Sequence, residues 1–378
     1  MDKNKLISIA CDVCVNKSHE NIWIQPPNVV CKKCGFAFIN PRPKKKFLND
    51  YYTNNIMSSG SVYCKTEELS RQGKFDTMKI NYIFAITKLT GGTVLEIGCR
   101  TGNLLRKFNK NKWERYGIEP SKKSFRNIKG NSLHLVNNTL EKARFDYNFF
   151  DLVIAASVLE HTFSPKEFVR KIHQYLKKTG FVYILVPNIY DPLFHRSDFD
   201  IDEHLSHFSK KSLKNLLEIN GFRIINLHES RTDKFIELIA IKSMPIKVNF
   251  NKIEYLKSKK FAKKETERVK KEEDRIRLLI NTTLEKWQKQ NKRIGVYGAG
   301  LHSLYLEELT DLSKKGVYYF DSDPVKQKIL FLNKKVFPPS KINTLGLSKF
   351  IISSESYQEE IYKTIKKYAT NSEILKLY

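Results

Sequence analysis

The stretch that most constrains the fold is residues 93–105, Thr-Val-Leu-Glu-Ile-Gly-Cys-Arg-Thr-Gly-Asn-Leu-Leu. Its apolar residues Val94, Leu95 and Ile97 predict a buried strand, and the glycines after them predict a tight turn into a helix that begins near Gly102. Glycine at such a turn lets the backbone approach a ligand, and the first N–H groups of a helix are free to bind it. Junctions of this kind bind nucleotide-like ligands at the carboxyl ends of strands in open α/β sheets.

An acidic residue inside this strand separates two kinds of nucleotide site. A dinucleotide site requires G-x-G-x-x-G, whereas this chain has Glu96-x-Gly98-x-x-x-Gly102. The next predicted strand, residues 115–119, ends in Glu119, where a carboxylate can accept hydrogen bonds from both hydroxyls of a ribose. Together these residues resemble the S-adenosylmethionine (SAM) site of class I methyltransferases, and a generic Rossmann junction is the alternative. SAM carries a sulfonium cation and no phosphate, so its site needs acids and backbone contacts.

The elements expected around this turn alternate between strands and helices. That alternation predicts right-handed crossovers and a mainly parallel sheet. A helix is expected over residues 66–89, with further helices over residues 165–177 and 210–220. Seven strands are expected, over residues 93–98, 115–119, 132–138, 150–157, 180–188, 222–227 and 235–241. The last two, joined by a short polar turn, are expected to form an antiparallel hairpin at one edge. The predicted fold class is therefore α/β, with a seven-stranded Rossmann-like methyltransferase domain.

Two cysteine pairs near the N-terminus predict a metal site. Cys11-x-x-Cys14 and Cys31-x-x-Cys34 are separated by sixteen residues, a gap within the usual range for a four-cysteine Zn²⁺ site. So short a segment has little core of its own, and metal binding would supply its folding free energy. We therefore expect an N-terminal ribbon that holds a structural Zn²⁺, with four free thiols as the alternative.

The C-terminal part repeats the strand–turn–helix pattern. Residues 293–302 contain Gly298 and Gly300, but Ser303 stands where a third glycine would be. Asp321 follows at the position of a ribose-binding acid. This predicts a second, smaller Rossmann-like domain, which could bind NAD or the nucleotide portion of a substrate. The expected domains are a zinc-binding ribbon (1–45), the SAM-dependent methyltransferase domain (46–245), a basic helical connector (246–292) and the C-terminal domain (293–378).

The formal net charge of +27 invites a nucleic-acid-binding interpretation. The charge is spread widely, in lysine more than in arginine, so we attribute it to compositional bias and do not expect nucleic acid as the partner. Peripheral contact with anionic surfaces is a side effect of such a charge. No apolar run has the length of a membrane span and no secretory signal is seen, so the expected location is the cytoplasm.

Three blocks of the sequence resemble the sugar C-methyltransferase family and its relatives in deoxysugar and surface-polysaccharide pathways. They are the cysteine ribbon continuing as residues 35–41, the SAM domain with Leu159-Glu160-His161 and residues 203–209, and the end domain with residues 297–300 and 321–324. The resemblance spans nearly the whole chain. It implies SAM as the methyl donor and a sugar or nucleotide sugar as the small-molecule substrate.

The resemblance also implies the catalytic residues. A Glu-His pair in the loop after the fifth strand corresponds to Glu203 and His204 here, with Ile201 where the family has a tyrosine. Methyl transfer from SAM to carbon or oxygen needs a base, and histidine titrates in the useful range. We expect His204 to be that base, oriented by Glu203, and His161 to be the second candidate.

The expected cofactor-binding residues follow the ends of successive strands. They are Glu96, Gly98, Gly102, Glu119, Asn138 and Ser157. The acceptor atom, whether carbon, oxygen or nitrogen, stays open. An RNA methyltransferase is the alternative enzyme, supported by the ribbon and the basic charge, and a SAM-binding scaffold without catalytic activity is the non-enzymatic alternative.

Overall fold

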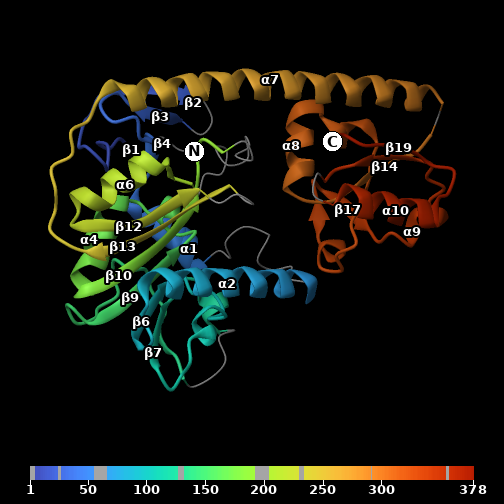
Figure 1. Ribbon diagram of the computed structural model, residues 1–378. Coiled ribbons are helices and arrows are strands. Elements are labelled where there is room, and N and C mark those ends of the chain that lie inside the picture. The colour runs from blue at the N-terminus through green and yellow to red at the C-terminus, as the bar shows by residue number, and fades with distance from the viewer. Residues whose placement is uncertain are drawn as a thin grey trace. The chain divides into compact units, whose positions relative to one another are not determined.

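The computed structural model describes residues 5–23, 27–54, 66–126, 132–191, 204–229, 234–290, 292–354 and 357–378. The chain divides into two compact units, Met1–Thr266 and Glu267–Tyr378. Each unit is built around its own sheet, and Figure 1 labels the elements of both.

The first unit contains a seven-stranded sheet with the order β12-β13-β10-β9-β6-β7-β8. All neighbouring pairs are parallel except those of β13, which runs antiparallel to β10 and β12. The strands are β6 (Gly92–Ile97), β7 (Trp113–Ile118), β8 (His134–Val136), β9 (Phe150–Ala156), β10 (Leu176–Pro187), β12 (Phe222–Glu229) and β13 (Phe235–Lys242). The predicted α/β fold class and the edge hairpin are confirmed.

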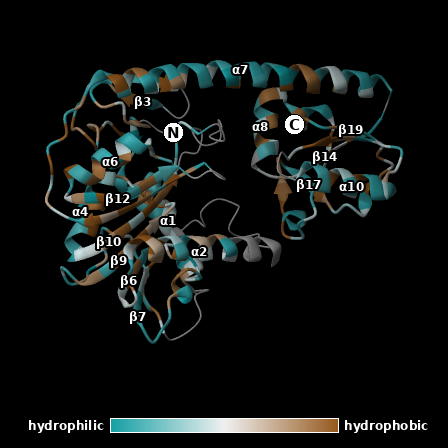
Figure 2. Ribbon diagram, viewed as in Figure 1, coloured by the Kyte–Doolittle hydropathy of each residue, from teal (hydrophilic) through white to brown (hydrophobic). Residues whose placement is uncertain are grey.

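Helices cover both faces of this sheet because successive strand residues point to opposite sides. On one side, Ile80 and Ile83 of α2 (Thr66–Thr87) join the apolar cluster that contains Val94, Leu152 and Ile154 of the central strands. On the other side, α4 (Pro165–Tyr175) and α6 (Lys210–Ile219) pack their apolar faces against the opposite side of the sheet. The hydropathy colouring in Figure 2 is correspondingly brown along the central strands.

One expected helix is wrong. The turn after β6 does not lead into a helix at Gly102; the chain forms turns and then a three-residue 3₁₀ helix, η2 (Leu105–Lys107). The connection from Ile97 to Trp113 is short, and its second half is rich in asparagine and lysine. Leu104, Leu105 and Phe108 are nevertheless buried under α2, so the apolar pattern that suggested a helix reflects core packing alone.

The N-terminal segment forms a four-stranded sheet with the order β11-β4-β3-β2. Its strands are β2 (His19–Trp23), β3 (Asn28–Cys31), β4 (Ala37–Ile39) and β11 (Ser206–His207). A separate pair joins β1 (Leu6–Ile7) to β5 (Arg42–Pro43), and α1 (Lys45–Asn54) follows. Strand β11 comes from the loop after β10, so the ribbon sheet includes a piece of the methyltransferase domain.

Helix α7 (Lys252–Lys289) is a single long helix whose two halves pack against different parts of the chain. Its first half packs on the ribbon, where Ser258 Oγ donates to the Gly35 carbonyl at 2.8 Å. Gly35 has φ +73, and a Cβ there would lie 2.4 Å from the Glu254 backbone, so only glycine allows this approach. The second half places Ile276, Ile280 and Leu284 in the core of the second unit.

The second unit is a smaller Rossmann-like domain with the strand order β16-β17-β15-β14-β18-β19. Five of these strands are parallel and β16 is antiparallel. The elements are β14 (Ile294–Tyr297), α8 (Leu301–Thr310), β15 (Tyr318–Phe320), β16 (Leu330–Phe331), β17 (Lys334–Phe337), α9 (Lys341–Thr344), β18 (Lys349–Ile352), α10 (Gln358–Tyr368) and β19 (Glu373–Leu375). Within the described ranges, none of the helices has the length and apolar character that a bilayer crossing needs.

Candidate functional site

All six expected cofactor-binding residues lie at or beyond the carboxyl ends of four neighbouring strands. Glu96 is the penultimate residue of β6, and Gly98 and Gly102 follow that strand. Glu119 follows β7, Asn138 follows β8 and Ser157 follows β9. Because these strands are adjacent and parallel, their carboxyl ends meet at one edge of the sheet. The edge is where an α/β sheet of this type binds its ligand.

The turn after β6 packs against the loop after β9 and is hydrogen-bonded to the end of β7. Gly98 has φ +73, and a Cβ on it would lie 2.8 Å from Val158 Cγ2 in the loop after β9. The N–H of Arg100, which itself has φ +46, donates to Glu119 Oε2 at 2.9 Å, while the N–H of Ser121 donates to Glu119 Oε1 at 2.8 Å. Each Glu119 oxygen keeps a lone pair that can accept a ligand hydroxyl.

Glu96 is a buried acid with unused hydrogen-bonding capacity. Its side chain is 8% exposed, and within the described residues its Oε2 has no hydrogen-bond partner. Burial, reinforced by the nearby Asp76 carboxylate, raises the pKa of Glu96 to about 8. An unpaired buried oxygen is costly unless a ligand satisfies it, so a cationic or N–H-bearing group is the fitting partner.

Two histidines from different loops meet beside this edge. His161 ends the 3₁₀ helix η3 (Leu159–His161) after β9, and His204 lies in the loop that leads to β11. Their ring centroids are 4.8 Å apart in an edge-to-face arrangement, and Tyr52 of α1 is 6.2 Å from the His161 ring. The sequence predicts both histidines separately, and the structure brings them together.

Glu160 completes this cluster and is not among the catalytic residues expected from the sequence. It is 2% exposed, its Oε1 lies 3.9 Å from His161 Nε2, and its Oε2 has no hydrogen-bond partner within the described part of the chain. Desolvation raises the pKa of Glu160 to about 8. Its position next to His161 in the sequence was the available signal.

A third histidine of this region, His207 in β11, has different surroundings. His207 is buried, its Nε2 lies 2.6 Å from Asn28 Oδ1, and burial lowers its pKa to about 3, which makes it a neutral structural histidine. Glu203, the expected partner of His204, and Ile201 lie outside the described residues.

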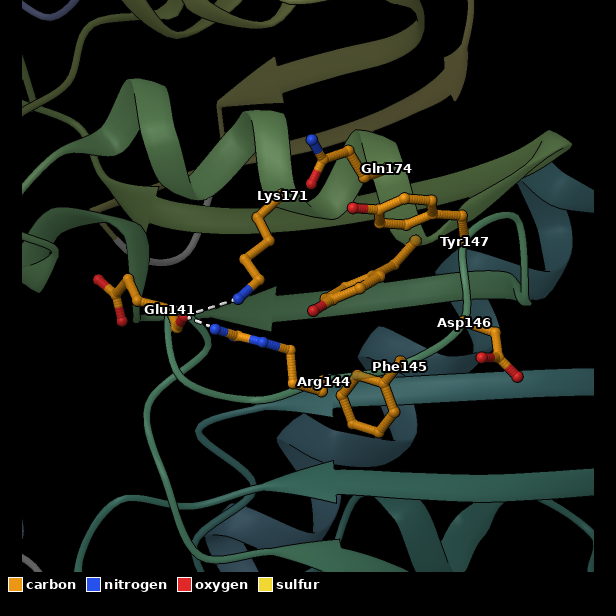
Figure 3. Close-up of a pocket in the computed structure, with 8 residues that line it drawn as sticks. Glu141, Arg144, Phe145, Asp146, Tyr147, Lys171 and Gln174 are labelled. Atoms are coloured by element: carbon orange, nitrogen blue, oxygen red, sulfur yellow. Dashed lines mark hydrogen bonds between the residues drawn. The ribbon is translucent and has the colours of Figure 1, made fainter.

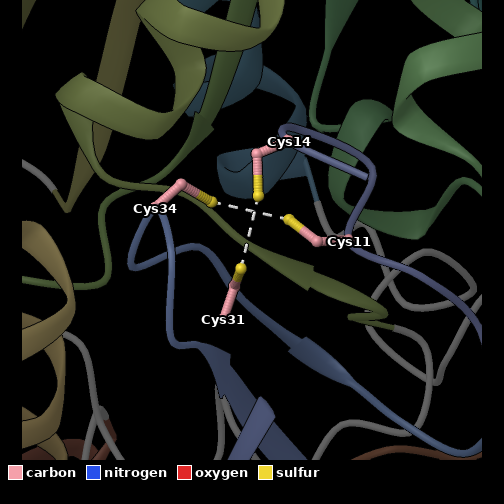
Figure 4. Close-up of side chains that lie close together, drawn as sticks. All are labelled: Cys11, Cys14, Cys31 and Cys34. Carbon is pink, nitrogen blue, oxygen red and sulfur yellow. Dashed lines mark hydrogen bonds between the residues drawn. The ribbon is translucent and has the colours of Figure 1, made fainter. Parts of the chain in front are cut away.

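The four ribbon cysteines form a compact cluster. Their sulfur atoms point to a common centre (Figure 4), with Cys11 Sγ 3.5 Å from Cys34 Sγ and Cys14 Sγ 3.4 Å from Cys31 Sγ. All four ligand atoms lie within 4.8 Å of one another. Tetrahedral Zn–S bonds of about 2.3 Å would separate the sulfurs by roughly 3.8 Å, so the cluster has the size of such a site.

A cavity of about 480 Å³ lies away from this edge, between α4 and the loop before β9 (Figure 3). Lys171 Nζ and Arg144 Nη1 both donate to the Glu141 carbonyl, at 2.7 and 3.1 Å. The cavity adjoins the amino ends of β9 and β10, because Tyr147 and Tyr175, which line it, lie just before these strands. It is therefore separate from the candidate site.

A family model described as a methyltransferase domain matches residues 41–227. This range contains the carboxyl edge of the sheet and both histidines. The enzyme class predicted from the sequence is thereby confirmed: the chain is a SAM-dependent methyltransferase. A search of the curated proteins found no match.

Solved structures of methyltransferases are also similar to this chain. A SAM-dependent methyltransferase from Aquifex aeolicus is 18% identical over 46% of this chain and 93% of its own, with a TM-score of 0.38. One from Mesorhizobium loti is 16% identical over 40% of this chain and 92% of its own, with a TM-score of 0.37. A plantazolicin methyltransferase, in complex with an analogue of that compound, is 14% identical over 46% of this chain and 84% of its own, with a TM-score of 0.39.

Proposed function

We propose that this methyltransferase transfers the methyl group of SAM to carbon or oxygen of a sugar or nucleotide sugar, in bacterial surface-polysaccharide or deoxysugar biosynthesis. The observation that carries the proposal is the meeting of His161 and His204 beside the carboxyl edge of the sheet, 4.8 Å apart. The sugar class is supported by the order of sequence blocks that resemble the sugar C-methyltransferase family.

The residues at the carboxyl edge fit SAM. The unpaired Oε2 of Glu96 can accept from the cofactor's ammonium group, and Glu119 can accept from its ribose. Gly98 and Gly102, both with φ +73, shape the turn beside which the ligand would lie, and Asn138 and Ser157 border the same edge. When bound, SAM supplies an electrophilic methyl group that is transferred by direct displacement.

The chain's own contribution to the chemistry is to align the acceptor and remove a proton. His204 is our first choice for the base and His161 the second, because both rings lie beside the edge and histidine exchanges protons near neutral pH. Buried Glu160 lies 3.9 Å from His161, and its ionised form would stabilise the charge that develops on that ring. Glu203 is proposed to orient His204.

The cysteine cluster is proposed to hold a structural Zn²⁺. Four cysteines complete a closed tetrahedral site and leave no position for substrate. The cluster also lies under the first half of α7, which covers the second knuckle at Gly35. Its function is therefore to fold the ribbon.

The second unit is proposed to bind the nucleotide portion of the substrate. Its turn after β14 repeats the arrangement of the first unit, since Ala299 N–H donates to Asp321 Oδ2 at 2.9 Å. Ser303 takes the place of the third glycine of a dinucleotide motif; it is buried, and its hydroxyl contacts the Gly298 carbonyl and, at 2.7 Å, Ser353 Oγ. This departs from the pattern of redox NAD sites.

Methyl transfer to a panel of nucleotide sugars, followed by mass spectrometry of the products, tests the proposal. The expected result is a mass gain of one methyl group on a nucleotide sugar, and no methylation of total RNA. The basic charge of +27 is the observation that favours RNA as the alternative substrate. Methylation of RNA alone would overturn the sugar proposal, and SAM binding without turnover on any acceptor would indicate the inactive scaffold.

A further inference from the structure

A single buried arginine holds the loops of both candidate histidines. Arg42, in β5, has 0% of its surface exposed. Its Nη1 donates to the Phe163 carbonyl at 2.6 Å, and its Nη2 donates to the Leu205 carbonyl at 3.1 Å. Phe163 lies two residues after His161, and Leu205 directly follows His204. The two arms of one guanidinium therefore reach the two loops whose histidine rings meet.

The Nε of Arg42 connects the guanidinium, and the loops that it contacts, to strand β4 of the ribbon. Its Nε donates to the Ile39 carbonyl at 3.1 Å, and Ile39 N–H in turn donates to the Leu205 carbonyl at 3.0 Å. On the other side, Arg42 Nη1 lies 3.8 Å from Asp12, which stands between the first two cysteines and accepts from Ser164 Oγ at 2.5 Å. The contacts thus run from the cysteine knuckle to the residue that caps α4.

The chemistry of these partners requires arginine. The planar guanidinium presents five N–H groups in a fixed fork, and three backbone carbonyls that point in different directions use three of its nitrogens. A lysine ammonium is a single point and cannot reach the same carbonyls with the same directions. Phe38, whose ring centroid is 5.6 Å from the Arg42 carbon Cζ, and the apolar cluster of Ile39, Leu48 and Leu205 exclude water from the site.

From these contacts we propose that Arg42 is a positioning residue for methyl transfer: it fixes the His161 and His204 loops to each other and to the cysteine ribbon. The inference rests on the proposed function for the role of the histidines. It adds a residue outside the SAM edge and assigns the ribbon a second function, which is to set the distance between the two rings.

The matched control is Arg115 in β7. It is also buried, at 5% exposure, and its two Nη atoms also donate to two backbone carbonyls, those of Phe108 and Ser132, at 3.2 and 3.1 Å. None of the described contacts of Arg115 involves a histidine loop. Arg115→Met therefore removes a comparable buried arginine from the same unit without touching the proposed machinery.

The first measurement needs no acceptor. The protein is labelled with ¹⁵N-histidine, and the imidazole signals of His161 and His204 are assigned with His161→Gln and His204→Gln variants. In Arg42→Met and Arg42→Lys we expect the signals of both histidines to shift or broaden together, whereas Arg115→Met leaves them in place. Unchanged signals of both histidines in a folded Arg42→Lys protein would overturn the proposal, and this milder variant decides the question if Arg42→Met does not fold.

The second measurement separates positioning from folding. With the nucleotide sugar that is methylated in the panel above, Arg42→Lys should lower kcat about 10-fold to 100-fold, since a displacement of about 1 Å can cost 10²-fold. SAM affinity by calorimetry and the zinc content should stay at the wild-type values, and guanidinium ion should restore part of the activity of Arg42→Ala. A kcat loss equal to that of Arg115→Met, with no guanidinium rescue, would contradict the proposal. If the signals of both histidines shift together in the Arg42 variants but the wild type methylates no sugar, the proposed function is wrong and the positioning role of Arg42 still holds.

Discussion

The backbone N–H of Arg100 donates to Oε2 of Glu119 across 2.9 Å. This bond joins the turn after β6 to the end of β7. It fixes the direction of the Glu119 carboxylate before any ligand binds. Burial raises the pKa of Glu119, and the two backbone N–H groups that it accepts act in the opposite direction. A preoriented acceptor loses less conformational entropy on binding than a mobile one.

Glu119→Ala should weaken SAM binding by roughly 1–3 kcal/mol, because a buried ribose would lose charge-assisted hydrogen bonds. Calorimetry with SAM measures the effect. Asp321→Ala is the matched control, since Asp321 accepts from Ala299 N–H in the same way in the other unit, and it should leave SAM affinity unchanged. Wild-type affinity in Glu119→Ala would show that the ribose lies elsewhere.

Glu96 predicts that SAM binding releases a proton. Because its pKa is raised to about 8 by burial, the carboxyl is protonated at pH 6–7 in the free protein, and a cationic ligand favours the ionised form. The SAM complex binds fewer protons than the free protein, so SAM affinity should rise with pH between about pH 6 and 7. This window lies below the ordinary pKa of an α-amino group, about 7.7–8.0, so the amino group of SAM stays cationic throughout it.

Calorimetry at pH 6–7 in buffers with different ionisation enthalpies measures the proton release. Glu96→Gln cannot release this proton, so the variant should show a SAM affinity that is less dependent on pH. Equal proton release by the wild type and Glu96→Gln would mean that another group titrates on binding.

His204→Gln should slow methyl transfer by about 10²–10⁴-fold while SAM binds normally, since this is the usual contribution of a positioned base. The measurement is kcat with the methylated acceptor at saturating SAM. Glu203→Gln should give a smaller loss. If His204→Gln keeps full turnover and His161→Gln abolishes it, the base is His161.

One Zn²⁺ per chain is expected from the cysteine cluster, whose paired sulfurs lie 3.4 and 3.5 Å apart. Metal analysis of the purified protein measures its content, and Cys31→Ser should lose the metal and lower the melting temperature. Buried Cys99 is distant in sequence from the cluster and serves as the control: Cys99→Ser should retain the zinc. Zinc-free wild-type protein of normal stability would refute this prediction.

Much of the candidate cofactor site could be predicted from the sequence because each of its acids stands next to the apolar run that forms its strand. Glu96 and Glu119 each sit at the end of an apolar run, and in a parallel sheet the ends of consecutive strands converge. The predicted helix at Gly102 was wrong because it, too, was inferred from a local apolar pattern. Apolar spacing reports burial, and Leu104, Leu105 and Phe108 are buried without a helix.

The role of Arg42 could not be predicted in this way. Its two Nη partners, Phe163 and Leu205, are 121 and 163 residues away along the chain, and both contacts use backbone carbonyls that leave no trace in residue type. Glu160 differs, because its partner His161 is its sequence neighbour, but its burial depends on the packing of a loop. Sequence patterns identify residues that face a ligand more readily than residues that hold the backbone behind them.

The pairing of β11 with β4, at Ser206 with Phe38 and His207 with Ala37, has a consequence for how the protein can be built and cut. During synthesis the ribbon emerges early, yet its edge strand meets its partner only after most of the methyltransferase domain has been made. Deletion of the ribbon would leave the segment after His204 as an unpaired strand, which is prone to aggregation. A catalytic fragment of this chain must therefore include the ribbon.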